Sequence, residues 1–217
     1  MRIRIDANII SKTDENIDLH YNHAIYSAIL NILPDDISTK IHDENNKTIK
    51  YFTFSSVFIK DDNCHFYISG EDDFIMHIIE GLQSNSMLRI KDLILDVYRI
   101  SELPGLNKKR NYLFKGNIIA CEIVNNKKVL IEDDERIEER LQSICEKKLR
   151  NRGLEIKPIK FTVISKKRNF LKYKKGVLVG YYSMVFLVTG DYETIQYFYE
   201  IGFGENTATG NGIVWEA

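Results

Sequence analysis

The chain has 217 residues, of which 44% are hydrophobic and 28% charged, and it contains only three prolines. This composition is typical of a globular protein with one large domain or two domains of about 100 residues each, and it excludes a disordered chain. The three cysteines form no CxxC pair, which favours reduced thiols in a cytoplasmic protein. No apolar run approaches the roughly 20 residues of a membrane span, and the N-terminus has no signal-peptide pattern. Secreted disulfide-rich proteins and membrane proteins are therefore excluded.

The net charge of −1 hides an uneven distribution of charge along the chain. Residues 107–175 carry 20 Lys and Arg against 9 Asp and Glu, whereas the remaining residues carry 10 against 22. A positive region in an otherwise acidic protein is typical of a surface that binds a polyanion. A solvated lysine-rich face would give the same count, and charge alone does not separate the two interpretations.

The first half of the chain shows periodicities of both strands and helices. Residues 1–9 alternate in the two-residue period of a strand, and the next apolar spacing is helical until Pro34 ends it. Ser69 and Asp72 form a capping pattern before the second helix. The patterns predict strand, helix, strand, strand, helix and strand in chain order, at residues 1–9, 21–33, 50–59, 64–68, 72–82 and 88–100.

The second half repeats this order. Residues 66–80 align without gaps on residues 186–200, and each copy reads as a strand, a turn at Gly70 or Gly190, and a helix that starts with acidic residues. The remaining strands are expected at 112–124, 161–165, 171–188 and 212–215, with a helix at 136–150.

The repeated order predicts an α+β protein of two tandem ferredoxin-like βαββαβ units, the arrangement found in RNA-recognition modules. The segment Leu103–Asn107 reads as a linker because it contains Pro and Gly between two polar stretches. We therefore expect an N-terminal domain at 1–103 and a C-terminal domain at 108–217.

The most specific motif is the glycine-rich segment 202–212, which has four glycines in eleven residues and lies between the last predicted helix and the last strand. Glycines let a backbone approach a ligand closely, so such a loop can present N–H groups to phosphates. The segment does not fit a dinucleotide-binding fingerprint, which requires a strand before it and a helix after it. A tight helix-to-strand connection without a ligand is the structural alternative.

Three segments together resemble the CRISPR-associated endoribonucleases that cut precursor CRISPR RNA within its repeats, the Cas-six family. Segment 202–214 resembles the glycine-rich signature of that family, residues 19–26 resemble the start of its first helix, and Ile41-His42 with residues 50–55 resembles its catalytic loop and second strand. Asn211 departs from the aromatic or aliphatic residue of many members. Through the order of elements, the resemblance covers nearly the whole chain.

The resemblance implies a metal-independent endoribonuclease in which the RNA 2′-hydroxyl attacks the adjacent phosphate, leaving a 2′,3′-cyclic phosphate and a 5′-hydroxyl. No cofactor and no metal are expected. The expected partners are CRISPR repeat RNA and other Cas proteins of an effector complex, and the protein itself is expected to be a monomer or homodimer. Two alternatives stay open: a non-catalytic RNA-binding subunit of such a complex, and an unrelated ferredoxin-like scaffold.

Within this resemblance, His42 is the proton-transfer residue and Lys50 supplies the charge that stabilises the transition state, with Lys47 as its substitute. Imidazole suits acid or base work because its ordinary pKa is about 6.5, and a lysine supplies a fixed positive charge. Some family members use a tyrosine late on the first helix, where this chain has Ile32, so that role is either absent here or taken by Tyr26. We expect His42 in a loop, where an ordinary exposed histidine is the alternative.

RNA-binding residues are expected on a basic hairpin with its turn near Asn169-Phe170, on the glycine-rich segment, and at Lys47. Basic residues supply phosphate contacts, and Phe170 and Tyr173 supply stacking surfaces. A charged, solvent-exposed hairpin is the alternative interpretation. The candidates are Lys47, Lys166, Lys167, Arg168, Lys172, Lys174, Lys175, Gly202, Gly204, Asn206, Thr207 and Gly210. His20 and His23 lie three residues apart, and capping or surface roles are expected for them.

Overall fold

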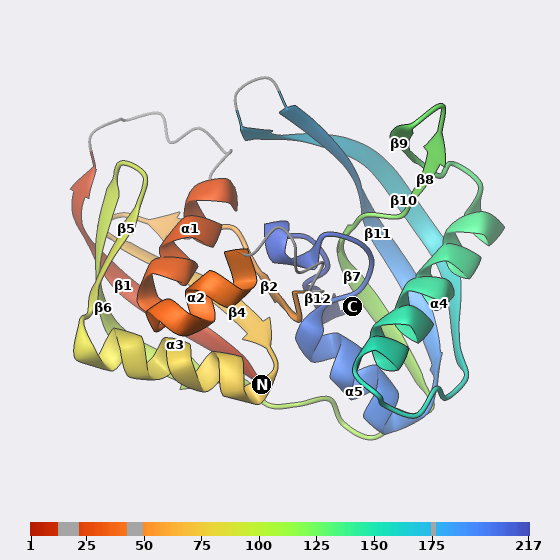
Figure 1. The fold of residues 1–217 in the computed structure, drawn as a ribbon, viewed down its shortest axis with the longest axis horizontal. Helices are drawn as coiled ribbons and strands as arrows, with labels where there is room; N and C mark the ends of the chain where they lie inside the picture. Colours follow the sequence, from red (N-terminus) through yellow and green to blue (C-terminus); the bar gives the residue numbers. More distant parts are fainter. Residues whose placement is uncertain (13–21, 43–49, 175–176) are drawn as a thin grey trace.

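A computed structural model describes residues 1–12, 22–42, 50–174 and 177–217 of the chain. The first half of the described chain forms one antiparallel sheet with its helices on one side (Figure 1). Its elements are β1 (Arg2–Lys12), α1 (Asn22–Ile32), α2 (Asp35–His42), β2 (Phe52–Phe54), β3 (Phe58–Lys60), β4 (Asn63–Gly70), α3 (Asp72–Ser84), β5 (Met87–Ile90) and β6 (Leu93–Glu102). The strand order is β2-β4-β1-β6-β5, and β3 also pairs with β4.

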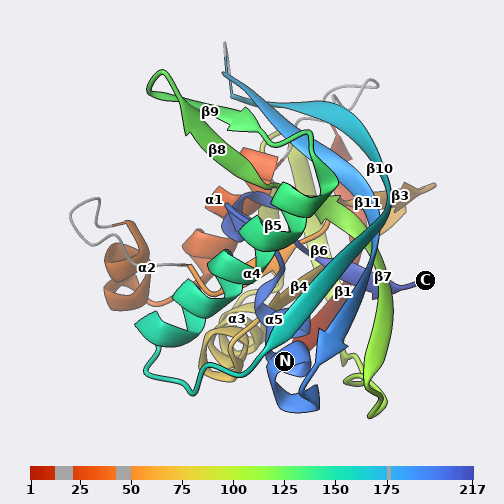
Figure 2. The ribbon, with the colours of Figure 1, turned by 90° about the vertical axis from the view of Figure 1, so that its right-hand side faces the viewer.

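The second half forms another antiparallel sheet and a separate two-stranded hairpin, β8–β9. Its elements are β7 (Asn111–Ile118), β8 (Cys121–Val124), β9 (Lys127–Leu130), α4 (Asp134–Asn151), β10 (Ile159–Lys174), β11 (Val177–Gly190), α5 (Tyr192–Ile201), the short 3-10 helix η1 (Thr207–Thr209) and β12 (Val214–Glu216). The order of the main sheet is β10-β11-β7-β12. Figure 2 shows the β8–β9 hairpin beside the far end of the long β10–β11 hairpin.

Both sheets have the same strand order when the strands are numbered within each half. The first strand, β1 or β7, lies between the strand that precedes the second helix, β4 or β11, and the last strand, β6 or β12. This is the order of the βαββαβ ferredoxin-like unit. The predicted fold class, two tandem ferredoxin-like units, is confirmed.

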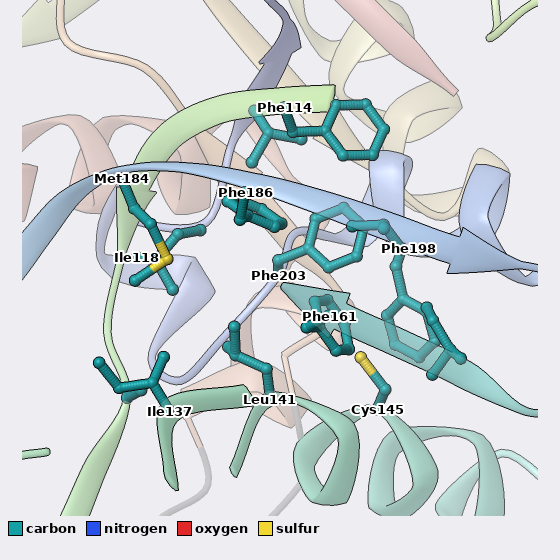
Figure 3. Close-up of a cluster of buried hydrophobic side chains, with 14 of the residues drawn as sticks. Phe114, Ile118, Ile137, Leu141, Cys145, Phe161, Met184, Phe186, Phe198 and Phe203 are labelled. Atoms are coloured by element: carbon teal, nitrogen blue, oxygen red, sulfur yellow. The ribbon is translucent and has the colours of Figure 1, made fainter. Parts of the chain in front are cut away.

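Each half has its own hydrophobic core, built from the residues whose periodicity predicted the elements. Ile3 and Ile5 of β1 are completely buried, as the alternation requires. The core of the second half is rich in phenylalanine, and Phe114, Phe186 and Phe203 meet there with ring centroids 5.6–6.1 Å apart (Figure 3). Phe203 belongs to the glycine-rich segment, so this core also anchors the segment.

The strand-to-helix turns of the repeat lie where the sequence predicts them, at Gly70 and Gly190. Asp191 caps α5, because its side chain accepts a hydrogen bond from the N–H of Thr194. The predicted capping by Ser69 and Asp72 is wrong. Glu71 occupies the N-cap of α3 without a side-chain hydrogen bond, and the hydroxyl of Ser69 donates to the carbonyl of Glu200 in the other half.

Three predicted strands are interrupted in the structure. The 50–59 run is divided into β2 and β3, the 88–100 run into the β5–β6 hairpin, and the 112–124 run into β7 and β8. The basic hairpin is also longer than predicted. Asn169 and Phe170 lie inside β10, paired with Tyr181 and Gly180, and the connection to β11 follows Lys174. The predicted turn near Asn169-Phe170 is therefore wrong.

The helix α2 was not predicted, and it changes the position expected for His42. Pro34 accepts the first hydrogen bonds of this helix, and Asp35 and Asp36 lie in its first turn, where acidic side chains favour a helix N-terminus. His42 is the last residue of α2 rather than a loop residue.

The two halves are joined at the N-terminus by Arg2, which is 2% exposed. Its guanidinium lies over the rings of Tyr199 (3.9 Å to the centroid) and Trp215 (4.5 Å), and it donates to the carbonyl of Val214 at 3.0 Å. The stacking of a buried guanidinium between aromatic rings fixes the first strand of one sheet against the last strand of the other.

Within the described ranges, no helix is both long enough and apolar enough to cross a membrane.

Candidate functional site

Tyr26 and Lys50 are 24 residues apart in the sequence and meet in the structure. The apolar spacing of α1 places Tyr26 on its buried face, and Lys50 lies just before β2. The ammonium group of Lys50 donates a hydrogen bond to the hydroxyl oxygen of Tyr26 and lies 4.4 Å from the centroid of its ring. The ring of Tyr26 is nearly parallel to that of Phe52, which holds it in place.

Burial changes the acidity of both groups. It lowers the pKa of Lys50, because a buried ammonium loses hydration, and it raises the pKa of Tyr26, because a buried phenolate is penalised in the same way. Tyr26 is therefore a neutral hydrogen-bonding group at neutral pH, and it can donate a proton but not act as a base.

The glycine-rich segment forms a tight loop with left-handed backbone at several positions. The φ angles of Gly210 and Gly212 are +79° and +91°. A Cβ at Gly212 would lie 2.4 Å from the carbonyl oxygen of Phe203, and one at Gly210 would lie 2.6 Å from the amide nitrogen of Asn22. These positions require glycine for both conformation and space.

The loop is attached to the first half of the molecule. The side chain of Asn22 donates to the carbonyl of Thr209, and the hydroxyl of Thr53 donates to that of Asn211, both at 2.8 Å. The hydroxyl of Thr207 donates to the carbonyl of Lys50 at 3.4 Å. η1 consequently lies beside β2 at the boundary between the two sheets (Figure 1).

A cavity of about 690 Å³ lies between these parts. Tyr26 and Lys50 form one wall, residues 204–209 form another, and α4 and β9 supply the rest. Its lining carries more positive than negative side chains. The described basic residues that line it are Lys50, Lys128, Arg140, Lys147 and Lys148, against the single carboxylate of Glu205.

Glu205 ties the loop to two of these basic side chains. Its carboxylate accepts hydrogen bonds from the guanidinium of Arg140 at 2.7 and 3.0 Å and from Lys128 at 3.3 Å. Lys50, Lys147 and Lys148 are left facing a concave surface, which suits an anionic ligand with several oxygen atoms.

The structure places the predicted site residues unequally. Gly204, Asn206 and Thr207 line the cavity beside Tyr26 and Lys50, as predicted for a common site. Gly202 lies behind this surface at the end of α5, and Gly210 packs on Asn22 outside the cavity lining.

Several predicted residues lie at the limits of the described chain. The backbone places His42 at the end of α2, and its side chain is outside the described part. The same applies to the side chains of Lys172 and Lys174, whereas Lys47 and Lys175 are outside the described residues altogether. Their roles remain predictions.

The basic hairpin does not reach the Tyr26–Lys50 cavity in the described residues. Lys166 is bound to Asp134 and to the carbonyl of Glu132, and Arg168 forms an ion pair with Glu132 at 3.0 Å. Arg168 instead lines a neighbouring hollow of about 330 Å³, which also includes Phe170 and shares Asn206 with the larger cavity.

The cavity-lining face of α4 was not predicted from the sequence. Arg140, Ile144, Lys147 and Lys148 follow helical spacing and share one face of this helix. The charge count and the predicted helix at 136–150 together indicated a basic helix. They could not show which of its faces lines the cavity, because that depends on how α4 packs against the loop.

Other candidate groups stay apart from the cavity. His23 is exposed, and His20 is outside the described residues. His77 pairs with Glu80 at 3.4 Å. Burial lowers the pKa of His65, whose ring stacks on that of Phe58.

The segment that carries the loop and α4 is similar to a known protein family. Residues 118–215 match the family model described as "CRISPR associated protein Cas6, C-terminal". This segment includes α4 and the whole glycine-rich loop. This part of the chain, slightly less than half of it, is similar to the C-terminal part of Cas6 proteins.

The similarity to Cas6 extends over the entire chain. The chain is 27% identical to the "CRISPR-associated endoribonuclease Cas6 1" of Methanocaldococcus jannaschii over 99% of its own length and 92% of that protein. A solved structure described as "CRISPR associated protein Cas6" matches with a TM-score of 0.80 and 25% identity, over 100% of this chain and 99% of the other. A solved structure of a Cas6-related protein from Pyrococcus furiosus matches with a TM-score of 0.82 and 24% identity, over 100% of this chain and 98% of the other.

These findings confirm the resemblance that the sequence predicted. The segment that matches the Cas6 family model supplies the loop and the basic face of α4, whereas Tyr26 and Lys50 precede it in the chain. The cavity is therefore built from both halves, and the half that the Cas6 family model covers does not complete it alone.

Proposed function

We propose that this protein is an endoribonuclease that cuts precursor CRISPR RNA within its repeats without a metal ion. The observation that carries the proposal is the Tyr26–Lys50 pair, which faces the glycine-rich loop across a cavity lined with basic side chains. The relative from M. jannaschii is named as an endoribonuclease, which supports the same reaction class.

The reaction is an attack of the RNA 2′-hydroxyl on the adjacent phosphorus. The 2′-oxygen–phosphorus bond forms, the bond from phosphorus to the 5′-oxygen breaks, and the products carry a 2′,3′-cyclic phosphate and a 5′-hydroxyl. The 2′-proton must pass to a base, and the leaving 5′-oxygen must receive a proton from an acid. The phosphorane that forms between these steps carries additional negative charge.

The residues divide these tasks by their chemistry. Lys50 stabilises the phosphorane charge, because its ammonium lies in a partly buried position where charge interactions are stronger than in water. Tyr26, which burial keeps protonated, orients Lys50 and can donate a hydrogen bond to the phosphate. His42 transfers the proton: its neutral imidazole takes the 2′-proton, and the imidazolium that results can give a proton to the leaving 5′-oxygen, since imidazole exists in both forms near neutral pH.

The RNA partner is proposed from charge. Lys147 of α4 and Lys167 of the hairpin offer phosphate contacts in the half that contains the match to the Cas6 family model. The division into domains at 1–103 and 108–217, the contacts with other Cas proteins and a monomeric or homodimeric state are part of the same proposal. Light scattering of the free protein and of its RNA complex tests the last of these.

A cleavage assay with repeat-containing RNA in EDTA tests the function. Wild type should cut the RNA and leave a cyclic phosphate. His42→Ala and Lys50→Met should bind the RNA but cut it much more slowly than wild type does. Lys160→Met should bind and cut as wild type does. Lys160 is an exposed lysine on β10 outside the cavity, so it controls for the loss of one charge.

The other outcomes separate the alternatives. Equal cleavage by wild type and His42→Ala would remove the histidine from the mechanism. Loss of wild-type cleavage in EDTA, restored by a divalent cation, would contradict the metal-independent reaction. Tight binding of several repeats without any cleavage would favour a non-catalytic RNA-binding subunit.

A further inference from the structure

Lys148 is a buried lysine that the reaction proposed above does not use. It lies on α4 with 5% of its surface exposed, although lysine is seldom buried to this extent. Its ammonium group donates a hydrogen bond to the carbonyl of Gly202 at 3.0 Å. Gly202 is the first residue of the glycine-rich loop and has a φ of +88°.

In the part of the chain that the structure describes, no acidic side chain neutralises this ammonium group. No carboxylate oxygen there forms an ion pair with Lys148, and the nearby ionisable group that favours its charged form is the thiol of Cys145 on the same helix. An unpaired buried charge is costly, and proteins normally pair it. One carbonyl accepts a single hydrogen bond, whereas an ammonium group has three to donate.

The position of Lys148 connects the loop to the cavity. Its side chain lines the cavity that contains Tyr26 and Lys50, and it holds the loop by Gly202 on the other side. The residues that follow Gly202 form a cavity wall from 204 to 209. A shift of the Lys148 side chain would therefore move the surface that faces the RNA.

We propose that Lys148 is a positioning residue for the cleavage reaction, whose charged side chain holds the glycine-rich loop and is completed by a phosphate group in the cavity. The proposal rests on the nuclease function inferred above. We infer the phosphate contact from the missing counter-charge, because the RNA that binds in the cavity would bring phosphate groups close to Lys148. The unpaired lysine is thus retained for function at a cost in stability.

The acidity of Lys148 agrees with this role. Burial lowers its pKa to about 8, so its charge is marginal just above neutral pH, and a bound phosphate would favour the charged form. Other ionisable groups face the cavity from every element around it. These groups are Tyr26 of α1, Lys50 before β2, Lys128 of β9, Arg140 and Lys147 of α4, and Glu205 of the loop.

Substitution by methionine separates positioning from simple structural support. Methionine matches the length of lysine without its charge, and apolar replacement of a buried charge is often neutral or stabilising. We expect Lys148→Met to lower the single-turnover cleavage rate about tenfold, as misplaced catalytic groups do, without lowering the free energy of unfolding. Lys148→Arg, which keeps the charge, should recover part of that rate, and Lys160→Met should cleave as wild type does.

Two kinetic results would overturn the proposal. Cleavage by Lys148→Met within twofold of wild type would show that the charge is not needed. An equal loss of rate and of stability in Lys148→Met and Lys148→Arg would show a purely structural lysine.

A second measurement does not depend on cleavage. The melting temperature is recorded with inorganic phosphate and with sodium chloride of the same ionic strength. Phosphate should stabilise wild type and Lys160→Met by a few degrees through binding to the folded state, and Lys148→Met by less than half as much. Equal stabilisation of all three proteins, or none of wild type, would overturn the phosphate site. If phosphate behaves as expected but no RNA is cut, the nuclease proposal fails and the anion site stands.

Discussion

The two halves of this molecule make the same connection, from the last helix to the last strand, in two ways. In the first half, β5 forms a hairpin with β6, and Lys91 turns the chain with a φ of +55°. This connection stays on its own sheet. In the second half, the glycine-rich loop leaves its sheet and bonds to Asn22 and Thr53 of the first half. The strand orders are alike, and the difference that bears on the cavity lies in this connection.

The comparison shows where the site comes from. The β5–β6 hairpin pairs its backbone within its own sheet, whereas two carbonyls of the glycine-rich loop, those of Thr209 and Asn211, accept hydrogen bonds from side chains of the first half. The cavity forms where this loop meets Tyr26 and Lys50. Two halves with the same strand order thus differ at this connection, and the cavity lies where the glycine-rich loop crosses the boundary.

The largest effect is expected from a change that breaks this connection. In Gly212→Ala, the new methyl group would lie 2.4 Å from a backbone carbonyl at a φ of +91°. We expect a loss of about 3 kcal/mol in the free energy of unfolding, since both strain and a backbone clash are introduced. Urea denaturation measures this loss.

Gly153→Ala is the matched control for that change. Gly153 follows α4 with a φ of +66°, and nothing lies within 4 Å of the position of its Cβ. The cost should be only that of the left-handed backbone, about 1 kcal/mol. Equal losses in the two variants would show that the close packing of the loop is unimportant.

The next largest effect is expected on the cleavage rate, from a change in the cavity wall that Tyr26 and Lys50 of the first half form. Lys50→Met removes the ammonium group that Tyr26 holds in the cavity. We expect the single-turnover rate to fall about 100-fold, as it does when a transition-state charge partner is lost. Binding of an RNA with a 2′-deoxy nucleotide at the cleavage site should change far less. Lys60→Met, an exposed lysine on β3, serves as the control. Parallel losses of rate and affinity in Lys50→Met would assign Lys50 to binding alone.

Each half also has a buried cation, and the two should respond differently to pH. Arg2 lies over two aromatic rings, and burial lowers its pKa to about 10, so Lys148 loses its proton at lower pH than Arg2 does. Lys148 has a folded-state pKa of about 8, below its ordinary 10.5. Because the unfolded chain holds this proton more tightly, the charged lysine destabilises the fold below pH 8. That cost is relieved as the pH rises from 8 toward 10.5.

A comparison of wild type with Lys148→Met isolates the contribution of Lys148 to the pH dependence of stability. Between pH 7 and pH 9.5, the stability of wild type relative to Lys148→Met should rise by about 2 kcal/mol. Denaturation curves of both proteins at several pH values measure it. A constant difference would mean that Lys148 keeps one charge state throughout this range.

The repeated helices and strands could be predicted because their boundaries and buried faces depend on residues close together in the sequence. The turns at Gly70 and Gly190 and the apolar faces of the helices follow from residues close together in the sequence. The hairpin β8–β9 was missed although its turn residues, Asn125 and Asn126, both have a positive φ, which asparagine tolerates in two-residue hairpin turns. The strand pattern of 112–124 concealed this turn.

The site was less predictable because it depends on contacts between distant residues. Spacing alone could not pair Tyr26 with Lys50, and these two residues came from the resemblance to a family. The charge count located the basic region around α4, but the inward direction of Lys148 depends on the packing of that helix against Gly202. A lysine in a charged helix is expected at the surface.

The smallest effect concerns two neighbouring lysines of β10 that point to opposite faces. Lys166 is half-buried and bound to Asp134, whereas Lys167 is exposed, with no ion pair among the described residues. Lys167→Ala should weaken RNA binding a few-fold and reduce the slope of log affinity against log salt by about 1, as loss of one phosphate contact does. Lys166→Ala should change the slope less, because Asp134 already neutralises its charge. Salt titrations of RNA binding measure both slopes, and a larger change for Lys166 would place the RNA on the opposite face of the hairpin.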